Sequence, residues 1–333
     1  MTLAAMLRGL LAGLALAAAG WVAYWWPRGH EVLALLGALL IALPHAPLMA
    51  LEFMLLRRAN LGDPAPTPTS AELLRAWAGE VLGAVRVFGW RLPFRATRYA
   101  DHLPAEGRGR RGLLLVHGFV CNRGLWNPWW PRLLDAGVPC VALNLQPVFG
   151  AIDDYADAID AAVRRLSNAT GRPPLLVGHS MGGLALRAWL QRYAGQTRVH
   201  GVITVGTPHH GTWLGRFAFS ANGVQMRWDS PWLGALAGAE ARAPVPRFTC
   251  FYSHCDNIVF PATTATLPGA DNRHLRGQAH VHMLQHPAVL DEVMAQLAEP
   301  DCAPPGAAQP GVNSRSPGST APASTSASAR TSA

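Results

Sequence analysis

The segment that most constrains this chain is Gly178–Gly182, which reads Gly-His-Ser-Met-Gly. It follows the short apolar run 175–177 directly and precedes a helical pattern over 184–193. A serine in that context predicts a tight strand-to-helix turn, which exposes the serine oxygen near the positive end of the helix dipole. A glycine-rich chain can contain such a pentapeptide by chance, but the flanking strand and helix favour Ser180 as a nucleophile.

Beyond Arg111, short apolar runs alternate with amphipathic helical patterns. The strand-like runs are 113–116, 138–143, 175–178 and 202–205. The helical patterns are 152–166 and 184–193. Continuous apolar strands are buried on both sides, and their alternation with helices is typical of a parallel sheet covered on both faces. The sequence therefore predicts an α/β fold with a mostly parallel sheet.

A serine nucleophile needs a base, and the base needs an acid that orients it, because a serine hydroxyl is unreactive at neutral pH. The run 248–252 has the pattern of a further strand, and Asp256 stands just beyond its end. That position suits the acid in the chain order Ser, then Asp or Glu, then His. We expect Asp256 to orient the base; the alternative is an aspartate that only caps its loop.

Four histidines follow in one stretch: His274, His280, His282 and His286. The base should lie on the loop ahead of the final helix, which the pattern places at 288–297. We favour His280, with His282 as the alternative base. His280, His282 and His286 could also hold a metal ion, but no acidic cluster accompanies them, so we expect no metal site.

Acyl transfer also needs hydrogen-bond donors for the developing oxyanion. With a Gly-x-Ser-x-Gly turn, these are the backbone N–H of the residue after the serine and one from the loop after an earlier strand. Met181 supplies the first, and Phe119, just beyond the run 113–116, is expected to supply the second. The alternative is that His117-Gly118 forms only a turn.

Three segments carry a resemblance to a known family: Val116–Phe119, Gly178–Gly183 and Gly206–Thr212. With them, residues 111–297 resemble the bacterial triacylglycerol lipases and their esterase relatives. The resemblance implies an α/β-hydrolase fold, a mostly parallel sheet with flanking helices and a cap or lid inserted at about 212–246. It assigns no calcium site and no cofactor.

The resemblance extends to the acid and the base. The family's acid lies in a Tyr-x-x-x-Asp-x-x-Val-x-Pro context, which 252–261 matches with Asp256. Its base lies in a Gly-x-x-His-x-x-x-Leu context, which 277–284 matches with His280, although Ala279 replaces the usual glycine. The segment 225–233 resembles the lid of these lipases.

Large apolar side chains are frequent in the expected cap. They are Trp213, Phe217, Phe219, Met226, Trp228, Trp232 and Leu233. Such an insertion above a nucleophile can line an acyl pocket or open at a lipid surface. The alternative is ordinary packing of a structural excursion.

Two apolar runs without charged residues, Gly9–Trp26 and Val32–Leu51, lie in the N-terminal part. Each is about long enough to cross a hydrocarbon layer of about 30 Å, and the first ends in aromatic residues that suit a membrane interface. We expect a transmembrane helical hairpin, with 1–58 as the membrane anchor. The alternatives are a cleaved signal peptide followed by one anchor, and a second run buried in the catalytic domain.

Arginine is distributed unevenly around these runs. Arg8 precedes the first, and Arg57 and Arg58 follow the second, whereas the connector between them holds Arg28. Positive charge is retained on the cytoplasmic side of membrane segments. We therefore expect a location in the inner (cytoplasmic) membrane, with the catalytic domain in the cytoplasm.

Composition sets the remaining boundaries. Alternating prolines mark 59–70 as a linker, and Ser70 is the expected N-cap of a helix over 71–87. At helical spacing, one side of that helix carries Leu73, Leu74, Trp77, Val81, Leu82 and Val85. The catalytic domain is expected at 71–300. Pro, Gly, Ser, Thr and Ala dominate 301–333, which predicts a disordered tail.

The net charge bears on binding partners, and the cysteine count bears on disulfides. The formal net charge is +8, and every Lys or Arg position is an arginine. The arginines are scattered, so we expect no nucleic-acid binding but some preference for anionic lipid headgroups. The chain has 5 cysteines, an odd number, and Cys250 and Cys255 can form a disulfide or remain buried thiols.

Together these patterns predict a serine carboxylic-ester hydrolase, a lipase or esterase that acts through an acyl-enzyme on lipid or other apolar esters. The alternatives are an acyltransferase that uses the same triad and a non-catalytic, membrane-anchored scaffold. The sequence does not indicate an oligomeric state.

Overall fold

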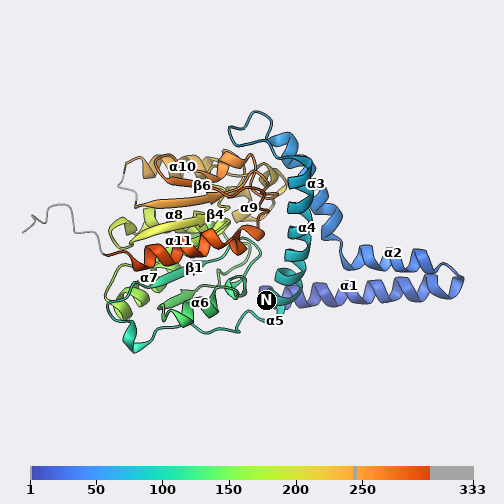
Figure 1. The fold of residues 1–333 in the computed structure, drawn as a ribbon, viewed down its shortest axis with the longest axis horizontal. Coiled ribbons are helices and arrows are strands. Elements are labelled where there is room, and N and C mark those ends of the chain that lie inside the picture. The colour runs from blue at the N-terminus through green and yellow to red at the C-terminus, as the bar shows by residue number, and fades with distance from the viewer. Residues whose placement is uncertain (1, 243–245, 301–333) are drawn as a thin grey trace, which may run out of the picture. The chain divides into compact units, whose positions relative to one another are not determined.

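The computed structural model describes residues 2–242 and 246–300, so the expected disordered tail, 301–333, lies outside the described residues. At the centre is a six-stranded sheet with parallel neighbours in the order β2-β1-β3-β4-β5-β6 (Figure 1). The strands are β1 Leu113–Val116, β2 Cys140–Ala142, β3 Leu175–His179, β4 Gly201–Val205, β5 Phe248–Tyr252 and β6 Asp271–His274.

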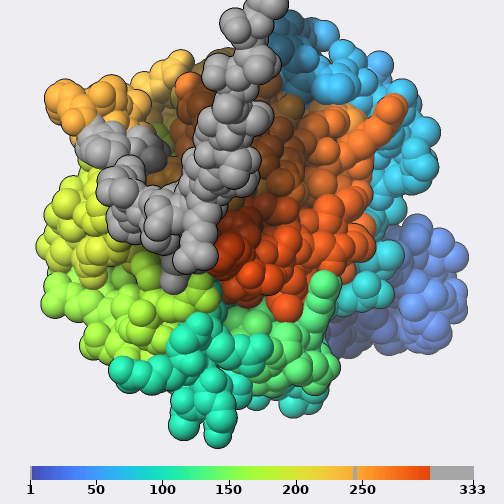
Figure 2. Space-filling model, turned by 60° about the vertical axis from the view of Figure 1, so that its left-hand side comes forward, coloured from blue at the N-terminus to red at the C-terminus, as the bar shows by residue number. Residues whose placement is uncertain are grey.

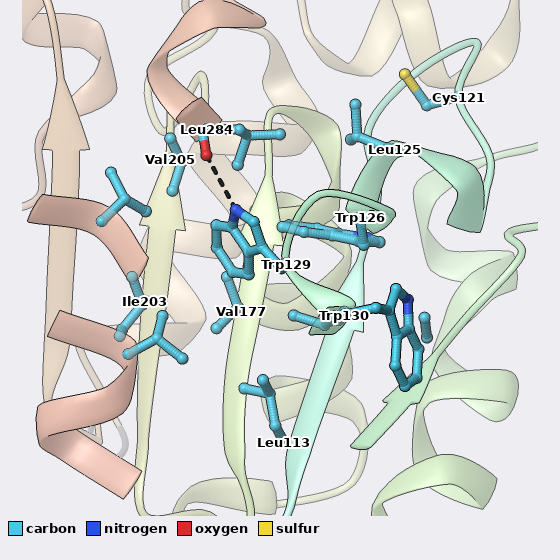
Figure 3. Close-up of a cluster of buried hydrophobic side chains, with 14 of the residues drawn as sticks. Leu113, Cys121, Leu125, Trp126, Trp129, Trp130, Val177, Ile203, Val205 and Leu284 are labelled. Atoms are coloured by element: carbon cyan, nitrogen blue, oxygen red, sulfur yellow. Dashed lines mark hydrogen bonds between the residues drawn. The ribbon is translucent and has the colours of Figure 1, made fainter. Parts of the chain in front are cut away.

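Helices cover both faces of the sheet. They are α6 Trp130–Asp135 and α11 Pro287–Ala298 on one face, and α7 Ala156–Thr170 and α8 Met181–Arg192 on the other. Successive residues of a strand point to opposite faces, so Leu113 lies in the first core and Leu114 in the second. In the first core, the indole N–H of Trp129 donates to the carbonyl of Leu284 at 3.0 Å (Figure 3).

Short helical segments join these elements. They are η3 Ala105–Gly107, η4 Arg123–Trp126, η5 Ile152–Tyr155, η6 Gly195–Thr197, η8 Ala262–Ala265 and η9 His282–Gln285. The expected cap contains η7 Trp213–Phe217, α9 Ala221–Gln225 and α10 Pro231–Glu240.

The predicted strands are confirmed, with β2 shorter than the expected 138–143. The sixth strand, β6, was not predicted, because its sequence, Asp-Asn-Arg-His, contains no apolar residue. It lies at the edge of the sheet, where a strand can carry exposed charged side chains.

The N-terminal helices are α1 Leu3–Trp25, η1 Trp26–Arg28, α2 Glu31–Ala42 and α3 His45–Ala59. Helices α1 and α2 pack against each other and project from the part of the molecule that contains the sheet (Figure 1, and dark blue in Figure 2). Leu3 and Leu7 are buried, whereas Leu10 and Leu16 are 58% and 74% exposed. The start of α1 is therefore packed, and the rest exposes apolar side chains.

The second apolar run forms two helices. Helix α2 has 12 residues, about 18 Å, and α3 leaves it at an angle of 63°. Pro44 lies at the break. A proline has no backbone N–H, so it cannot continue the helical hydrogen bonds. Among the described residues, α1 alone is long and apolar enough to cross a bilayer, and the bent α2–α3 pair adds a crossing only as a broken span. The expected hairpin of two spanning helices is therefore not shown.

Helix α4, Ser70–Arg86, continues through a π-helical turn, η2 Val87–Arg91, into α5 Leu92–Phe94. Its N-cap is Thr69 and not Ser70. Thr69 Oγ1 accepts the N–H of Glu72 at 3.2 Å, and the Glu72 carboxylate accepts the N–H of Thr69 at 2.9 Å. This reciprocal capping box fixes the start of the helix one residue earlier than predicted.

The apolar side of α4 is only partly buried. The buried residues of the helix are Glu72, Ala76, Glu80, Gly83 and Ala84. Three residues of the apolar side, Leu74, Leu82 and Val85, are 64%, 60% and 42% exposed. The helix thus turns two carboxylates inward and leaves leucines outside. Glu80 accepts backbone N–H groups of the His280 loop, as described below, and Glu72 caps the helix and contacts Arg276.

Candidate active site

Ser180 occupies the turn between β3 and α8, as the sequence predicts. Its φ of 55° and ψ of −128° are rare for a residue with a side chain. The turn is tightly packed, since a Cβ on Gly182 would lie 2.3 Å from the carbonyl oxygen of Val116. The backbone N–H of Ser180 donates to the carbonyl of Val205 at 2.9 Å. Contacts with β1 and β4 therefore hold the strained turn in place.

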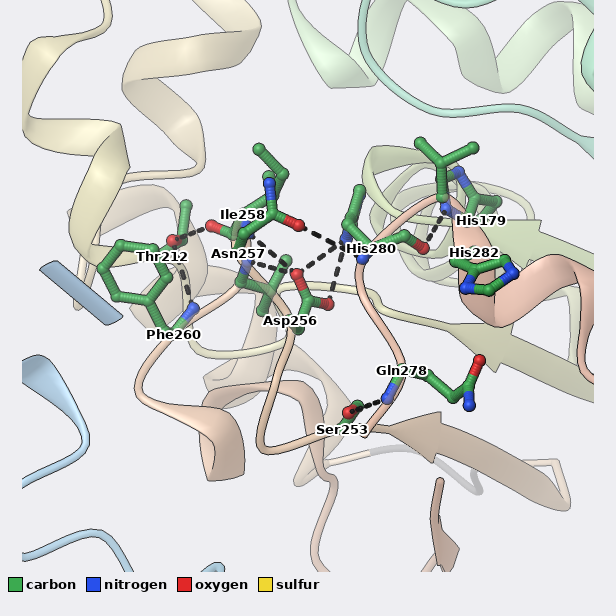
Figure 4. Close-up of polar contacts among 12 residues, drawn as sticks. His179, Thr212, Ser253, Asp256, Asn257, Ile258, Phe260, Gln278, His280 and His282 are labelled. Atoms are coloured by element: carbon green, nitrogen blue, oxygen red, sulfur yellow. Dashed lines mark hydrogen bonds and ion pairs between the residues drawn. The ribbon is translucent and has the colours of Figure 1, made fainter. Parts of the chain in front are cut away.

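Asp256 and His280 form a buried pair, 1% and 5% exposed. His280 Nδ1 lies 2.9 Å from each carboxylate oxygen of Asp256 (Figure 4). The same carboxylate accepts the backbone N–H of Ile258 at 2.9 Å and of Val259 at 2.8 Å. Asp256 is thus fixed by its own loop, and it orients the imidazole so that Nε2 is left for a third group.

The backbone next to Ser180 lies close to this pair. A Cβ on Gly206, the residue after Val205, would lie 3.1 Å from both Asp256 Oδ2 and His280 Nδ1. The ring of His179, the residue before Ser180, has its centroid 4.8 Å from that of the His280 ring. Within the described residues no side-chain hydrogen bond joins Ser180 to His280; such bonds are often long without a substrate.

The surroundings of His280 favour its charged form. Burial opposes the charge, but the negative charge of Asp256 and its hydrogen bond outweigh burial. The charges of Glu80 and Glu52 act in the same direction, so the pKa of His280 is raised above its ordinary value.

The other histidines lie elsewhere. His282 packs against α4, where a Cβ on Gly79 would lie 3.1 Å from His282 Nδ1. His286 Nδ1 accepts the N–H of Ala288 at 3.3 Å and caps α11. His274 pairs with His254 at 2.7 Å. Of the four histidines considered, His280 is the one paired with Asp256.

The loop after β1 also contacts the serine. A Cβ on Gly118 would lie 2.7 Å from the Cβ of Ser180. Phe119 is the next residue in the chain after Gly118. Val120 has a φ of 50°, a costly value for a β-branched residue. Met181, the other expected donor, begins α8 and is 1% exposed. Both expected donors therefore adjoin Ser180 along the backbone or through a contact.

His117 holds this loop in shape. Its Nε2 accepts the N–H of Leu145 at 3.0 Å, so the proton lies on Nδ1, which donates to the carbonyl of Gly118 at 2.9 Å. Burial lowers the pKa of His117 to about 4, so the ring is neutral at pH 7. The loop conformation thus depends on an uncharged imidazole.

Two acidic residues that the sequence analysis missed support the His280 loop from the N-terminal helices. Glu80 of α4 is 2% exposed, and its carboxylate accepts the N–H of Val281 at 2.9 Å and of His282 at 3.1 Å. Burial raises the pKa of Glu80 to about 7, against the effect of these hydrogen bonds. No local sequence pattern marks Glu80, because its partners lie 201 and 202 residues away.

The second acid, Glu52, acts through an intermediate residue. Its carboxylate accepts the side-chain N–H of Asn257 at 2.7 Å. The side-chain oxygen of Asn257, Oδ1, in turn accepts the backbone N–H of His280 at 3.3 Å. Helix α3, part of the expected anchor, is thus connected to the histidine through one residue.

The cap exposes part of its aromatic content. Phe219 is 95% exposed, Phe217 59% and Trp228 45%, whereas Met226 and Leu233 are buried in the second core. The expected cap therefore has a packed base and an exposed aromatic edge.

The described cysteines are buried free thiols, Cys250 and Cys255 among them. Cys250 lies in β5, and Cys255 follows that strand. The two do not pair in this structure. Cys302 lies outside the described residues.

Comparisons with known proteins agree with this geometry. A family model for the alpha/beta hydrolase fold matches residues 113–250. The mature lipase BlEst2 of Bacillus licheniformis is 17% identical, with a TM-score of 0.51 over 57% of this chain and 92% of its own. Lipase B of Aspergillus fumigatus is 21% identical, with a TM-score of 0.52 over 60% of this chain and 55% of its own. No curated protein matches the sequence.

The sheet order, the serine turn and the family match define the class: the chain has the α/β-hydrolase fold. Within that class it resembles lipases and esterases. The matched range includes Ser180 and Phe119, whereas Asp256, His280 and the supporting residues Glu52 and Glu80 lie outside it.

Proposed function

We propose that this protein is a serine carboxylic-ester hydrolase whose triad is Ser180, Asp256 and His280. The observation that carries the proposal is the buried Asp256–His280 pair beside a serine in a strained strand-to-helix turn. This combination of an activated base and a preorganised serine is the arrangement that acyl transfer requires.

In the proposed reaction, Ser180 Oγ attacks the ester carbonyl while His280 Nε2 accepts its proton. The backbone N–H groups of Phe119 and Met181 stabilise the oxyanion of the tetrahedral intermediate. His280 then protonates the leaving alcohol, and an acyl-enzyme remains on Ser180. Water, deprotonated by His280, attacks the acyl-enzyme and releases the carboxylic acid.

The proposed substrates are lipid or other apolar acyl esters. The exposed aromatic edge of the cap, with Phe217, Phe219 and Trp228, supports an apolar acyl group. The two similar solved structures are both called lipases, which supports the same class.

Two measurements test this function. A fluorophosphonate probe should label the wild type and leave Ser180→Ala unlabelled. A series of p-nitrophenyl esters from acetate to palmitate should show hydrolysis and report the preferred acyl length. Labelling of Ser180→Ala at the wild-type rate, or no turnover of any ester, would contradict the proposal. Adding an alcohol acceptor separates hydrolysis from acyl transfer by the product ratio.

We further propose that α1 crosses the inner membrane, that the bent α2–α3 pair returns the chain as a broken span, and that the hydrolase domain lies in the cytoplasm. The exposed apolar surface of α1 supports attachment, and Arg8, Arg57 and Arg58 support this orientation. Phosphatase and fluorescent reporters fused after Leu297 in a bacterial host test it. Phosphatase activity with a dark fluorescent fusion would place the domain outside.

A further inference from the structure

The continuous helical segment formed by α4, η2 and α5 has an outer surface unlike that of a soluble protein. Leu74, Leu82, Trp90 and Phe94 are 64%, 60%, 52% and 48% exposed. Its inner side carries Glu80, whose carboxylate holds the His280 loop, so these apolar side chains cannot turn inward without losing those bonds. Exposed apolar side chains in such number mark an interaction surface.

A basic hollow of 260 Å³ lies at the end of this segment. Its lining includes Trp90, Arg91, Arg95, Arg98 and Tyr99. The guanidinium of Arg95 lies 5.0 Å from the Trp90 ring, and that of Arg98 lies 5.4 Å from the Tyr99 ring. The hollow thus combines three cations with two aromatic rings that have polar N–H or O–H groups.

These three arginines have no carboxylate partner within 2–242 and 246–300. Nearby Asp101 is already shared by Arg123 and Arg165, at 2.7 Å and 2.6 Å. Burial and, after it, the charge of Arg86 lower the pKa of Arg91, so the surroundings disfavour this cation. A phosphate would neutralise the cluster and accept its N–H groups in the fork geometry that guanidinium favours.

The position of the hollow identifies where that phosphate comes from. The start of α1 packs on this same segment: Leu3 and Leu7 share a buried cluster with Val87 and Leu92 (Figure 1). Beyond Leu7 the helix is exposed, first at Arg8 and then along side chains that are mostly apolar. If α1 is embedded in a bilayer from this point, the hollow lies at the level of the lipid headgroups, where Trp and Arg are favoured.

We propose that the outer surface of α4–η2–α5 rests on a bilayer and that the hollow of Arg91, Arg95 and Arg98 binds the phosphate of an anionic phospholipid headgroup. The inference rests on attachment through α1 and does not depend on the hydrolase chemistry. It adds to α1 a second membrane contact, one that selects lipid by charge.

The test is flotation of the full chain with vesicles of phosphatidylcholine alone and of phosphatidylcholine with 30% phosphatidylglycerol. We expect the wild type to partition at least tenfold more strongly onto the anionic vesicles. The triple variant Arg91→Gln, Arg95→Gln, Arg98→Gln should lose most of that ratio. The control, Arg108→Gln, Arg164→Gln, Arg242→Gln, removes the same charge from exposed sites and should keep it.

A second pair of variants tests the apolar surface. Leu82→Asp should lower partitioning onto both vesicle types at least fivefold, whereas Leu134→Asp, at a residue of α6 that is 36% exposed, should not. Circular dichroism establishes that each variant is folded. Equal wild-type partitioning onto the two vesicle types, or equal loss in both arginine triples, would overturn the lipid site. Fluorophosphonate labelling of the wild type, measured separately, keeps a failure here distinct from a failure of the hydrolase proposal.

Discussion

The His280 loop is held between two regions of different origin. On one side, the carboxyl edge of the sheet supplies Asp256, which contacts the imidazole ring itself. On the other side, α4 supplies Glu80, which contacts only the backbone of the next two residues. One carboxylate orients the proposed base, and the other fixes the loop that carries it. The proposed site thus has a chemical half at the carboxyl edge of the sheet and a supporting half on the N-terminal helices.

The largest expected effect lies in the chemical half. Ser180→Ala removes the proposed nucleophile and should lower kcat by about 10⁴-fold or more. Initial rates on the preferred p-nitrophenyl ester measure it, with circular dichroism as the check on folding. A variant that keeps a tenth of the activity would assign the nucleophile to another residue.

Next comes the comparison of two neighbouring histidines. His280→Ala should reduce kcat nearly as far as the serine variant, because the base and the nucleophile act as a unit. His282→Ala should cause at most a partial loss, since His282 packs on α4 away from Asp256. The kcat of both variants, measured in parallel, tests this assignment. A larger loss in His282→Ala than in His280→Ala would assign the base to His282.

The supporting half should matter less. In Glu80→Gln, one amide oxygen replaces two carboxylate oxygens, so one backbone N–H of the loop loses its acceptor. Leaving a buried donor unpaired costs about 1–3 kcal/mol, and we expect kcat to fall roughly tenfold with a lowered melting temperature. Glu106→Gln, at an exposed carboxylate, is the control. An unchanged rate would mean that the loop keeps its shape without α4.

The smallest effect concerns pH. The base must be neutral, and the pKa of His280 is raised, so kcat/KM should increase with pH through a midpoint above the ordinary value of 6.5. Negative charge at Glu80 stabilises the imidazolium, and its removal in Glu80→Gln should shift this midpoint to lower pH. The pH profile of kcat/KM on a neutral ester measures the shift. A shift to higher pH would contradict the assigned electrostatics.

The chemical half could be predicted from the sequence because its signals are local. The turn around Ser180 is specified by adjacent glycines and by the strand and helix beside it. Asp256 and His280 lie in short patterns next to elements of the sheet, so the chain order was enough to select them. The structure places these two together, although their roles in catalysis stay a prediction.

The supporting half could not be predicted, for a physical reason. Helical periodicity identifies an apolar side, and the usual inference is that this side is buried. In α4 the requirement to satisfy the buried N–H groups of Val281 and His282 outweighs that rule, and no sequence window contains both partners.

The inward carboxylates of α4 have a consequence for anyone who wishes to isolate the hydrolase from its anchor. A fragment that starts after α5 would be free of the exposed leucines but would lack Glu80 beneath the His280 loop. A fragment that starts at Thr69 would keep Glu80 but also the exposed apolar side of the helix, and it would lose Glu52. Each starting point therefore exchanges exposed apolar surface against support for the His280 loop.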